Sequence, residues 1–150
     1  MQAEVLAAMR GKLSAPSGSA IIVVAMAAAD GADGRPVGVV EMYKDAVPDI
    51  AARLHTACDR EFGFGWLASM AVAPEFHRQG LGRALVEAAL EPVRTEWGYD
   101  RVALHVFEDN EAALGLYKAM GFETVDSQPQ VWMQWLKQRQ QQLMLLDISS

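Results

Sequence analysis

The stretch PEFHRQGLGRAL, residues 74–85, decides how the middle of this chain is expected to fold. It follows an apolar run that stops at Pro74, and it opens a helical pattern. Amide groups in the first turn of a helix have no partner within the helix, and glycine lets an anion approach them closely. Two glycines and three basic side chains occupy this turn: Gly80, Gly82, His77, Arg78 and Arg83. The stretch therefore predicts an anion-binding turn between a strand and a helix.

An ordinary strand-to-helix loop is the competing interpretation of two glycines separated by one residue. The turn is not a Walker loop, because GxxxxGK followed by Ser or Thr is absent. It is not a dinucleotide fingerprint either, because Leu85 stands at the third glycine position and the glycines do not directly follow the strand.

A second informative block, LHVFEDNEAALGLYKAMGF, covers residues 104–122. It predicts a strand, a polar turn and a helix that begins after the N-cap Asn110 and stops at Gly121. Three- and four-residue steps place Asn110, Ala113 and Tyr117 on one flank of that helix. Taken alone, Tyr117 is more typical of a half-buried packing residue than of an acid.

The remaining pattern predicts an alternation of strands and helices. Strands are expected at 20–27, 37–44, 66–72, 101–107, 122–125 and 131–136, and helices at 2–10, 81–96 and 110–120. Residues 50–60 are expected to form a short helix or an ordered excursion. Pro92 is expected to kink the 81–96 helix or to end its regular part. Residues 1–136 are predicted to be a single domain, and the Gln-rich residues 137–150 an appended tail.

Composition excludes several classes of protein. Thirteen Lys and Arg against nineteen Asp and Glu give a net charge of −6, which argues against a nucleic-acid binder. A single cysteine, Cys58, rules out a disulfide framework, and no metal site is expected. The longest apolar run, 20–29, is too short to span a membrane, and no secretory signal is recognised. We expect a cytoplasmic protein.

Together the two blocks resemble the GCN5-related N-acetyltransferase (GNAT) family. Its motif A resembles His77-Arg78-Gln79-Gly80-Leu81-Gly82. Its motif B, Asn-x-x-Ala-x-x-x-Tyr-x-x-x-Gly-Phe, is matched by Asn110, Ala113, Tyr117, Gly121 and Phe122. The resemblance covers residues 20–136. It implies a mixed α/β fold of the α+β type, with a twisted, mostly antiparallel sheet flanked by helices and a shortened N-terminal region.

The resemblance also implies a set of site residues. Acetyl-CoA, the co-substrate, would be bound by Met70, Ala71, Val72, His77, Arg78, Gln79, Gly80, Leu81, Gly82, Arg83 and Asn110. Tyr117 would protonate the departing CoA thiolate, and a backbone amide near Val72 would polarise the thioester carbonyl. His105 stands where many relatives carry a glutamate base. It is either that base or a structural histidine hydrogen-bonded within the sheet.

The implied reaction is acetyl transfer to a primary amine: a peptide N-terminus, a lysine or a small amine. A non-catalytic acyl-CoA-binding or regulatory module, and a plain interaction domain, are the alternatives. Only residues 1–19 stand where relatives carry a strand and two helices. Either the excursion at 45–65 or a partner chain completes the acceptor site, or one sheet face and the acceptor site are incomplete. A homodimer is left open, and no nucleic-acid or membrane partner is expected.

Overall fold

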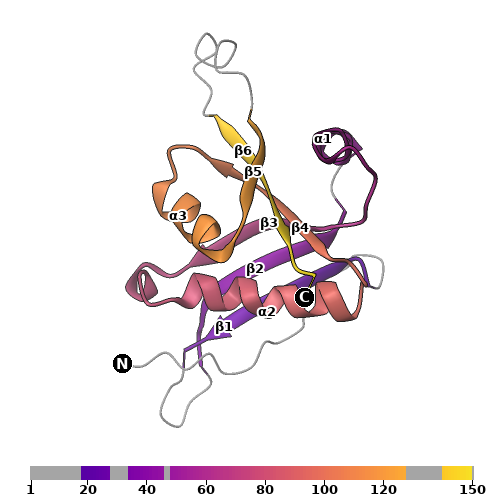
Figure 1. The fold of residues 1–150 in the computed structure, drawn as a ribbon. Coiled ribbons are helices and arrows are strands. Elements are labelled where there is room, and N and C mark those ends of the chain that lie inside the picture. Colours follow the sequence, from indigo (N-terminus) through magenta and orange to yellow (C-terminus); the bar gives the residue numbers. More distant parts are fainter. Residues whose placement is uncertain (1–17, 28–33, 46–47, 128–139, 150) are drawn as a thin grey trace. The chain divides into compact units, whose positions relative to one another are not determined.

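The computed structural model describes residues 18–27, 34–45, 48–127 and 140–149. In chain order their elements are β1 (Ala20–Met26), β2 (Pro36–Lys44), α1 (Pro48–Cys58), β3 (Gly65–Val72), the 3-10 turn η1 (Pro74–Phe76), α2 (Leu81–Thr95), β4 (Arg101–Phe107), α3 (Glu111–Met120), β5 (Glu123–Ser127) and β6 (Gln141–Asp147) (Figure 1). The strands follow the order β1-β2-β3-β4-β6-β5. This mixed α+β arrangement confirms the expected fold class.

The chain divides into two compact units. Unit 1 consists of Met1–Lys44 and Leu67–Gly98, and unit 2 of Asp45–Trp66 and Tyr99–Ser150. Strand β3 begins in unit 2 and continues into unit 1. Across the described residues, none of the helices combines the length and the hydropathy of a membrane span.

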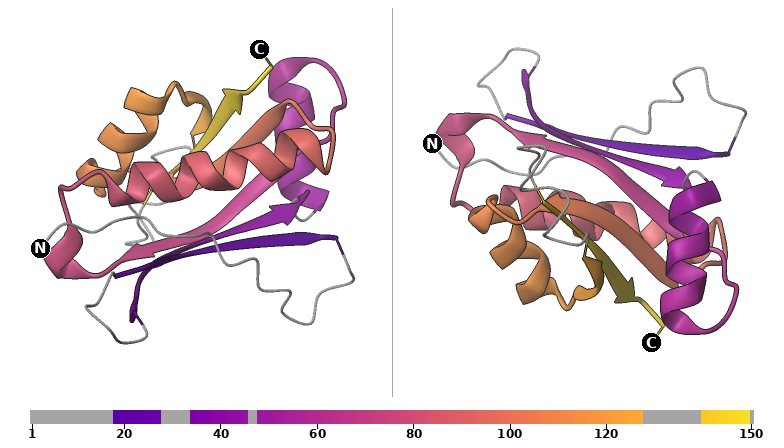
Figure 2. Two further views of the ribbon diagram at one scale, coloured as in Figure 1. Left: turned by 90° about the horizontal axis from the view of Figure 1, so that it is seen from below. Right: turned by 90° about the horizontal axis from the view of Figure 1, so that it is seen from above.

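Unit 1 is built on an antiparallel pair of strands with α2 packed against it (Figure 2). Both strands are rich in valine and isoleucine, whose branched side chains suit a pleated surface. The side chains that α2 buries recur at helical spacing: Leu81, Leu85, Val86, Ala89 and Val93. Gly38 on β2 makes the close approach possible, because a Cβ there would lie 2.8 Å from Cδ1 of Leu85.

Helix α2 does not end at its internal proline. It remains helical through Pro92 to Thr95, and the amide of Glu96 still donates to the Pro92 carbonyl at 2.8 Å. The prediction that Pro92 ends the regular helix is therefore wrong. The ring sits three residues before the helix C-terminus, so only one interior hydrogen bond is lost there.

Unit 2 is built on three antiparallel strands in the order β4-β6-β5. Leu143 of β6 lies opposite both His105 of β4 and Asp126 of β5. Residues directly opposite each other in an antiparallel ladder share one face of the sheet. Helix α1 covers that face, where Ile50 and Leu54 join Leu143 in a buried cluster that also contains Phe64 and Ala103.

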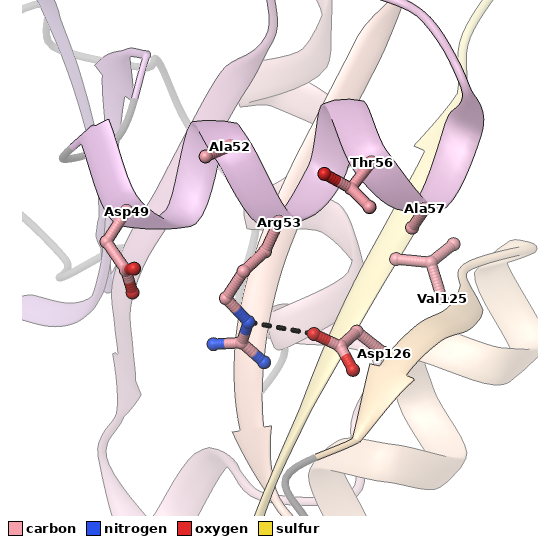
Figure 3. A pocket seen from close by; sticks show the side chains of 7 residues that line it. All are labelled: Asp49, Ala52, Arg53, Thr56, Ala57, Val125 and Asp126. Carbon is pink, nitrogen blue, oxygen red and sulfur yellow. Dashed lines mark hydrogen bonds and ion pairs between the residues drawn. The ribbon is translucent and has the colours of Figure 1, made fainter.

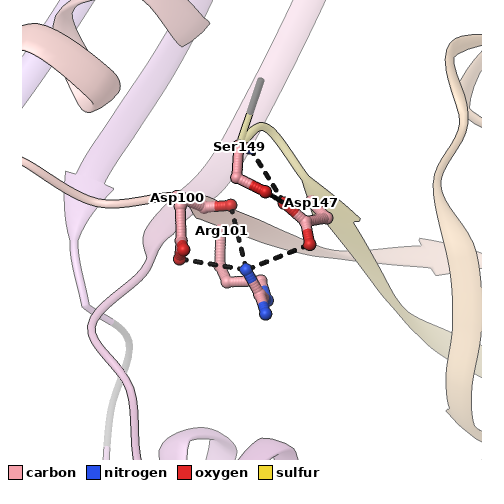
Figure 4. A network of polar contacts seen from close by, with 4 residues as sticks. All are labelled: Asp100, Arg101, Asp147 and Ser149. Atoms are coloured by element: carbon pink, nitrogen blue, oxygen red, sulfur yellow. Dashed lines mark hydrogen bonds and ion pairs between the residues drawn. The ribbon is translucent and has the colours of Figure 1, made fainter.

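The C-terminal residues correct the prediction of an appended tail. Gln141–Asp147 forms β6, which pairs with both β4 and β5 and buries Leu143, Met144 and Leu146. The strand is held at its end by Arg101, whose guanidinium pairs with Asp100 at 3.0 Å and with Asp147 at 3.2 Å (Figure 4). Hydrogen bonds from Ser149, and the Arg101 charge, lower the pKa of Asp147.

Most of the other predicted elements are confirmed to within a few residues. The ambiguous excursion contains α1, and the predicted strand at 122–125 is β5. The expected partner of that strand, at 131–136, lies outside the described residues, as does the expected helix at 2–10. The strand observed beside β5 is β6.

Candidate functional site

The connection between β3 and α2 in unit 1 exposes a run of backbone. Residues 77–80 are all exposed, while Phe76 is buried and anchors the preceding turn. Arg78 and Gly80 have positive φ values of 63° and 79°. Gly80 is the N-cap of α2 and has no side-chain oxygen to offer to the first amides of the helix. The first turn of α2 therefore presents uncapped N–H donors at the positive end of the helix dipole, which suits a phosphate.

The side chains of this connection hold the backbone in place. Nε2 of His77 lies 2.7 Å from the carbonyl oxygen of Val72, which can only accept, so Nε2 carries the hydrogen. The amide of Gln79 donates to the Glu75 carbonyl at 3.0 Å. A hydrogen bond from Arg35 lowers the pKa of Glu75, so this carboxylate stays ionised and paired at neutral pH. The imidazole predicted to flank an anion thus ties the turn to the end of β3.

The positive charges beside the turn differ in their partners. Arg83 donates to Glu87 at 3.0 Å, one turn along the same helix. Arg78 makes no hydrogen bond or ion pair with any described residue, and its side chain is exposed. Within the part of the chain that the structure describes, Arg78 is therefore a cation of this turn with no competing partner.

Several side chains near the end of β3 are accessible to solvent. Ala68, Ser69 and Ala71 are exposed, and Met70 and Val72 are half-buried. The chain then returns to β2 through the bond from the amide of Ala73 to the carbonyl of Val37, at 2.8 Å. Small exposed side chains on a strand end leave room for an extended ligand beside the backbone.

In unit 2, helix α3 begins and ends at the residues that the sequence predicts. The side-chain oxygen of Asn110 accepts from the amide of Ala113 at 3.3 Å, which confirms the predicted N-cap. Its Nδ2 group remains as a donor. Gly121 ends the helix with a φ of 103°, as predicted.

Tyr117 on α3 is buried, with 5% of its surface exposed. Its ring packs edge-to-face on Phe122, with centroids 5.5 Å apart. The hydroxyl makes no hydrogen bond with any described residue. Burial raises the pKa of Tyr117, so the phenol is protonated throughout the neutral range and can act as a proton donor.

His105 on β4 lies on the face of unit 2 that α1 covers. The ring is half-buried and packs edge-to-face on Trp66, with centroids 5.2 Å apart. Its Nε2 is fully buried and has no hydrogen-bond partner among the described residues. Burial, and then the charge of Arg53, lowers the pKa of His105, while Asp126 opposes this shift. A neutral imidazole with an unpaired nitrogen can accept a proton.

A pocket of about 410 Å³ lies between α1 and β5 (Figure 3). It is lined by Asp49, Ala52, Arg53, Thr56, Ala57, Val125 and Asp126. Nε of Arg53 donates to Oδ2 of Asp126 at 2.8 Å, and both side chains are partly exposed. The terminal nitrogens of Arg53 have no partner among the described residues.

The sequence profile of the acetyltransferase (GNAT) family matches residues 5–122. The chain belongs to the GNAT family. GCN5-related N-acetyltransferase 7, chloroplastic, from Arabidopsis thaliana is 38% identical over 85 residues, which is 57% of this chain and 30% of that protein. Ribosomal protein bS18-alanine N-acetyltransferase from Escherichia coli (strain K12) is 41% identical over 56 residues, or 37% of each chain.

Solved GNAT structures share the fold. The crystal structure of Arabidopsis thaliana NAA60 in complex with a bisubstrate analogue superposes with a TM-score of 0.69 at 19% identity, covering 89% of this chain and 78% of that one. The aligned residues cover only about a third of the length of each of the two curated relatives named above.

The structure of this GNAT chain groups the predicted site residues by unit. The range 70–83 lies in unit 1, whereas His105, Asn110 and Tyr117 lie in unit 2. Within unit 2, His105 shares its face with Leu143, while Gly121 at the end of α3 lies against Leu146, three positions further along β6 and so on the other face. The predicted roles of these residues remain predictions.

The sequence interpretation missed Arg53, Asp49 and Asp126. Asp49 and Arg53 are four residues apart on α1, a spacing that places them on one side of the helix. The four-residue spacing is informative only if residues 50–60 are taken to form a helix. Asp126 lies 73 residues beyond Arg53, and no local pattern connects the two.

Proposed function

We propose that this GNAT chain transfers the acetyl group of acetyl-CoA to a primary amine by direct attack. The observation that carries the proposal is the exposed, uncapped first turn of α2 behind a glycine N-cap, in a chain that belongs to this family. Residues 77–82 and Arg83 offer backbone N–H groups and positive charge to the diphosphate. The backbone of Met70, Ala71 and Val72 is the proposed track for the pantetheine arm.

In the proposed reaction the neutral amine nitrogen attacks the thioester carbonyl carbon, and the carbon–sulfur bond breaks as the amide forms. Tyr117 gives its proton to the leaving thiolate, because a buried phenol remains protonated at neutral pH. His105, held neutral by burial and by Arg53, takes the proton lost by the amine. Asn110 uses its Oδ1 to cap α3, so its Nδ2 group is the part available to the pantetheine arm.

The strength of base that the reaction needs depends on the acceptor. An alkyl amine with a pKa of about 10.4 is neutral in roughly one molecule in 2,500 at pH 7. The pKa of an α-amine, about 7.7–8.0, lies at most about one unit above that pH, so a much larger fraction of it is neutral. A weakly basic imidazole at residue 105 therefore fits an α-amine or a similar low-pKa amine better. Cytoplasmic localisation and a homodimer remain predictions from the sequence.

A panel of amines with release of free CoA thiol as the readout tests this function. We expect thiol release that depends on both acetyl-CoA and an amine, with α-amines ahead of alkyl amines at pH 7. Binding of acetyl-CoA without turnover of any amine would favour the alternative, a non-catalytic acyl-CoA-binding module.

A further inference from the structure

The last peptide group of β3, between Val72 and Ala73, is hydrogen-bonded at both ends. Nε2 of His77 donates to the carbonyl oxygen of Val72 at 2.7 Å, and the amide of Ala73 donates to the carbonyl oxygen of Val37 at 2.8 Å. All four residues belong to unit 1. A peptide group is planar, so bonds at its oxygen and at its N–H together fix the orientation of the whole plane. The end of this strand is therefore held where strand ends commonly fray.

The two bonds also decide which way Val72 faces. No peptide bond in the described residues is cis, so the carbonyl of Val72 and the amide of Ala73 point in opposite directions. The Ala73 amide points to Val37 on β2, and the Val72 carbonyl therefore points away from β2. In an extended strand the N–H and the C=O of one residue lie on the same side. The amide of Val72 thus faces away from β2 as well, on the side where the His77 ring stands.

The His77 ring changes what the end of β3 offers to a ligand. The carbonyl oxygen of Val72 already accepts a hydrogen bond from the imidazole, and the N–H of the same residue is a donor. The thioester carbonyl of acetyl-CoA is an acceptor, and its oxygen gains negative charge as the amine attacks. A donor that is held in place before the reaction stabilises that charge best. The imidazole therefore favours a carbonyl oxygen over an N–H group as the ligand of Val72.

The turn in turn holds the imidazole in position. The backbone amide of His77 donates to the carbonyl of Pro74 at 3.2 Å. Glu75 pairs with Arg35 through its side chain, and its carbonyl accepts from the amide group of Gln79 at 3.0 Å. These bonds fix the backbone on which the ring is mounted. The turn proposed for the diphosphate and the strand end proposed for the thioester are thus connected through one side chain.

We propose that His77 is a positioning residue for acetyl transfer: its hydrogen bond to the Val72 carbonyl holds the Val72 amide in the direction that polarises the thioester. The family resemblance implies only that residue 77 binds acetyl-CoA. Here the backbone of His77 stays in the turn, whereas the imidazole acts through Val72 on the chemical step. This inference rests on the proposed acetyl transfer and names a residue that sets its rate.

His77→Phe tests the role, because it keeps an exposed ring of similar size and removes the donor. We expect kcat to fall about tenfold or more, since a misplaced donor stabilises the transition state less well. The Kd for free CoA, which has no thioester carbonyl, should stay within about twofold of the native value. An unchanged kcat would overturn the inference. A Kd that rises as much as kcat falls would also overturn it, because His77 would then act in binding.

Two further variants separate the hydrogen bond from general effects on the fold. His77→Gln keeps a side-chain N–H donor and should recover part of the lost kcat; a rate as low as that of His77→Phe would overturn the role of the bond. His55→Phe is the matched control, because Nε2 of His55 lies 3.0 Å from the carbonyl of Phe62 in unit 2. It should leave kcat and the Kd for CoA at their native values. An equal loss of kcat in His55→Phe would contradict a specific role for His77.

NMR tests the geometry without any turnover. Ring nitrogen signals of the neutral His77 side chain should show the hydrogen on Nε2, and a hydrogen on Nδ1 would overturn the inference. Amide exchange at Ala73 should become several-fold faster in His77→Phe and stay at the native rate in His55→Phe, because only the first variant releases the peptide group. Unchanged exchange in His77→Phe would show that the ring does not hold the strand end.

The assays distinguish this inference from the proposed function. A native protein that releases no thiol with any amine overturns the proposed acetyl transfer, and the inference with it. An active native protein whose His77→Phe variant keeps the native kcat overturns the inference alone.

Discussion

The glycine turn of unit 1 and the α1-covered face of unit 2 are constructed in opposite ways. The turn offers main-chain N–H groups, and its side chains, His77 and Gln79, bond to nearby carbonyls within the same stretch. The face offers side chains from α1, β3, β4 and β5, and its central ion pair joins residues 73 positions apart. The turn proposed for the co-substrate is thus local and built from backbone, whereas the face beneath α1, which carries the proposed base His105, is assembled over long range.

The largest expected effect comes from filling the turn. Millimolar CoA should raise the melting temperature of the native protein, because a ligand stabilises the folded state that binds it. Gly82→Trp should abolish this rise, because the indole fills the proposed diphosphate-binding site at the start of α2. Gly115→Trp is the matched control, since a Cβ there meets no atom within 4 Å. An unchanged shift in Gly82→Trp would remove the turn from the binding site.

Removing one hydroxyl in unit 2 should affect turnover and spare binding. Tyr117→Phe is expected to lower kcat by roughly 10²-fold, the scale of a general acid, while the Kd for acetyl-CoA stays within about twofold. Tyr43→Phe removes an exposed hydroxyl and should leave both quantities unchanged. If Tyr117→Phe retains the native rate, the thiolate obtains its proton elsewhere.

His105 is expected to set the pH dependence of the rate. The neutral ring is the active form, so kcat/KM should fall at acid pH as the ring of the free enzyme gains its proton. His105→Ala should lower the rate and remove this acidic limb. A limb that persists unchanged in the variant would show that another group carries it, and His105 would then be structural.

Asn110 allows capping to be separated from ligand binding. Asn110→Ala should cost about 1 kcal/mol of unfolding free energy, because the amide of Ala113 loses its acceptor. Asn110→Asp keeps the cap but loses the Nδ2 donor, so it should retain the stability and raise KM for acetyl-CoA a few-fold. Equal KM values for Asn110→Asp and the native protein would confine Asn110 to capping.

The smallest expected effect is on stability as the pH falls. Burial and Arg53 lower the pKa of His105 in the folded protein, whereas the unfolded chain binds the proton from about pH 6.5 downward. The unfolded state then holds more protons, so the free energy of unfolding decreases as the pH drops below about 6.5, until the folded pKa is reached. Urea titrations should show a smaller decrease between pH 7 and pH 5 in His105→Gln. The same pH dependence of the unfolding free energy in the native protein and in His105→Gln would contradict a lowered pKa of His105 in the folded state.

The features that the sequence predicted well are local ones. The turn at Gly80 and the cap at Asn110 depend on a few adjacent residues, and the structure confirms both conformations. The helical composition of residues 50–60 was ambiguous because Pro48 precedes this stretch and Gly63 and Gly65 follow it. Proline is nevertheless well suited to the first position of a helix, where Pro48 stands in α1. A missing amide hydrogen costs nothing at that position.

Strand β6 was missed for a different reason. The sequence QQLMLLD lacks the strict alternation of a half-buried strand, and its place between β4 and β5 is set by pairing with residues far along the chain. The Arg53–Asp126 pair was missed in the same way. Local sequence thus predicted the proposed co-substrate site, while the arrangement of residues beneath α1 required the folded chain.

Calorimetric titration of acetyl-CoA into the native protein, at two temperatures so that a vanishing enthalpy does not mask binding, tests the central claim most directly. We expect one site per chain with a sub-millimolar Kd, absent in Gly82→Trp. A native protein that shows no binding heat at either temperature would contradict the proposed diphosphate-binding site at the start of α2.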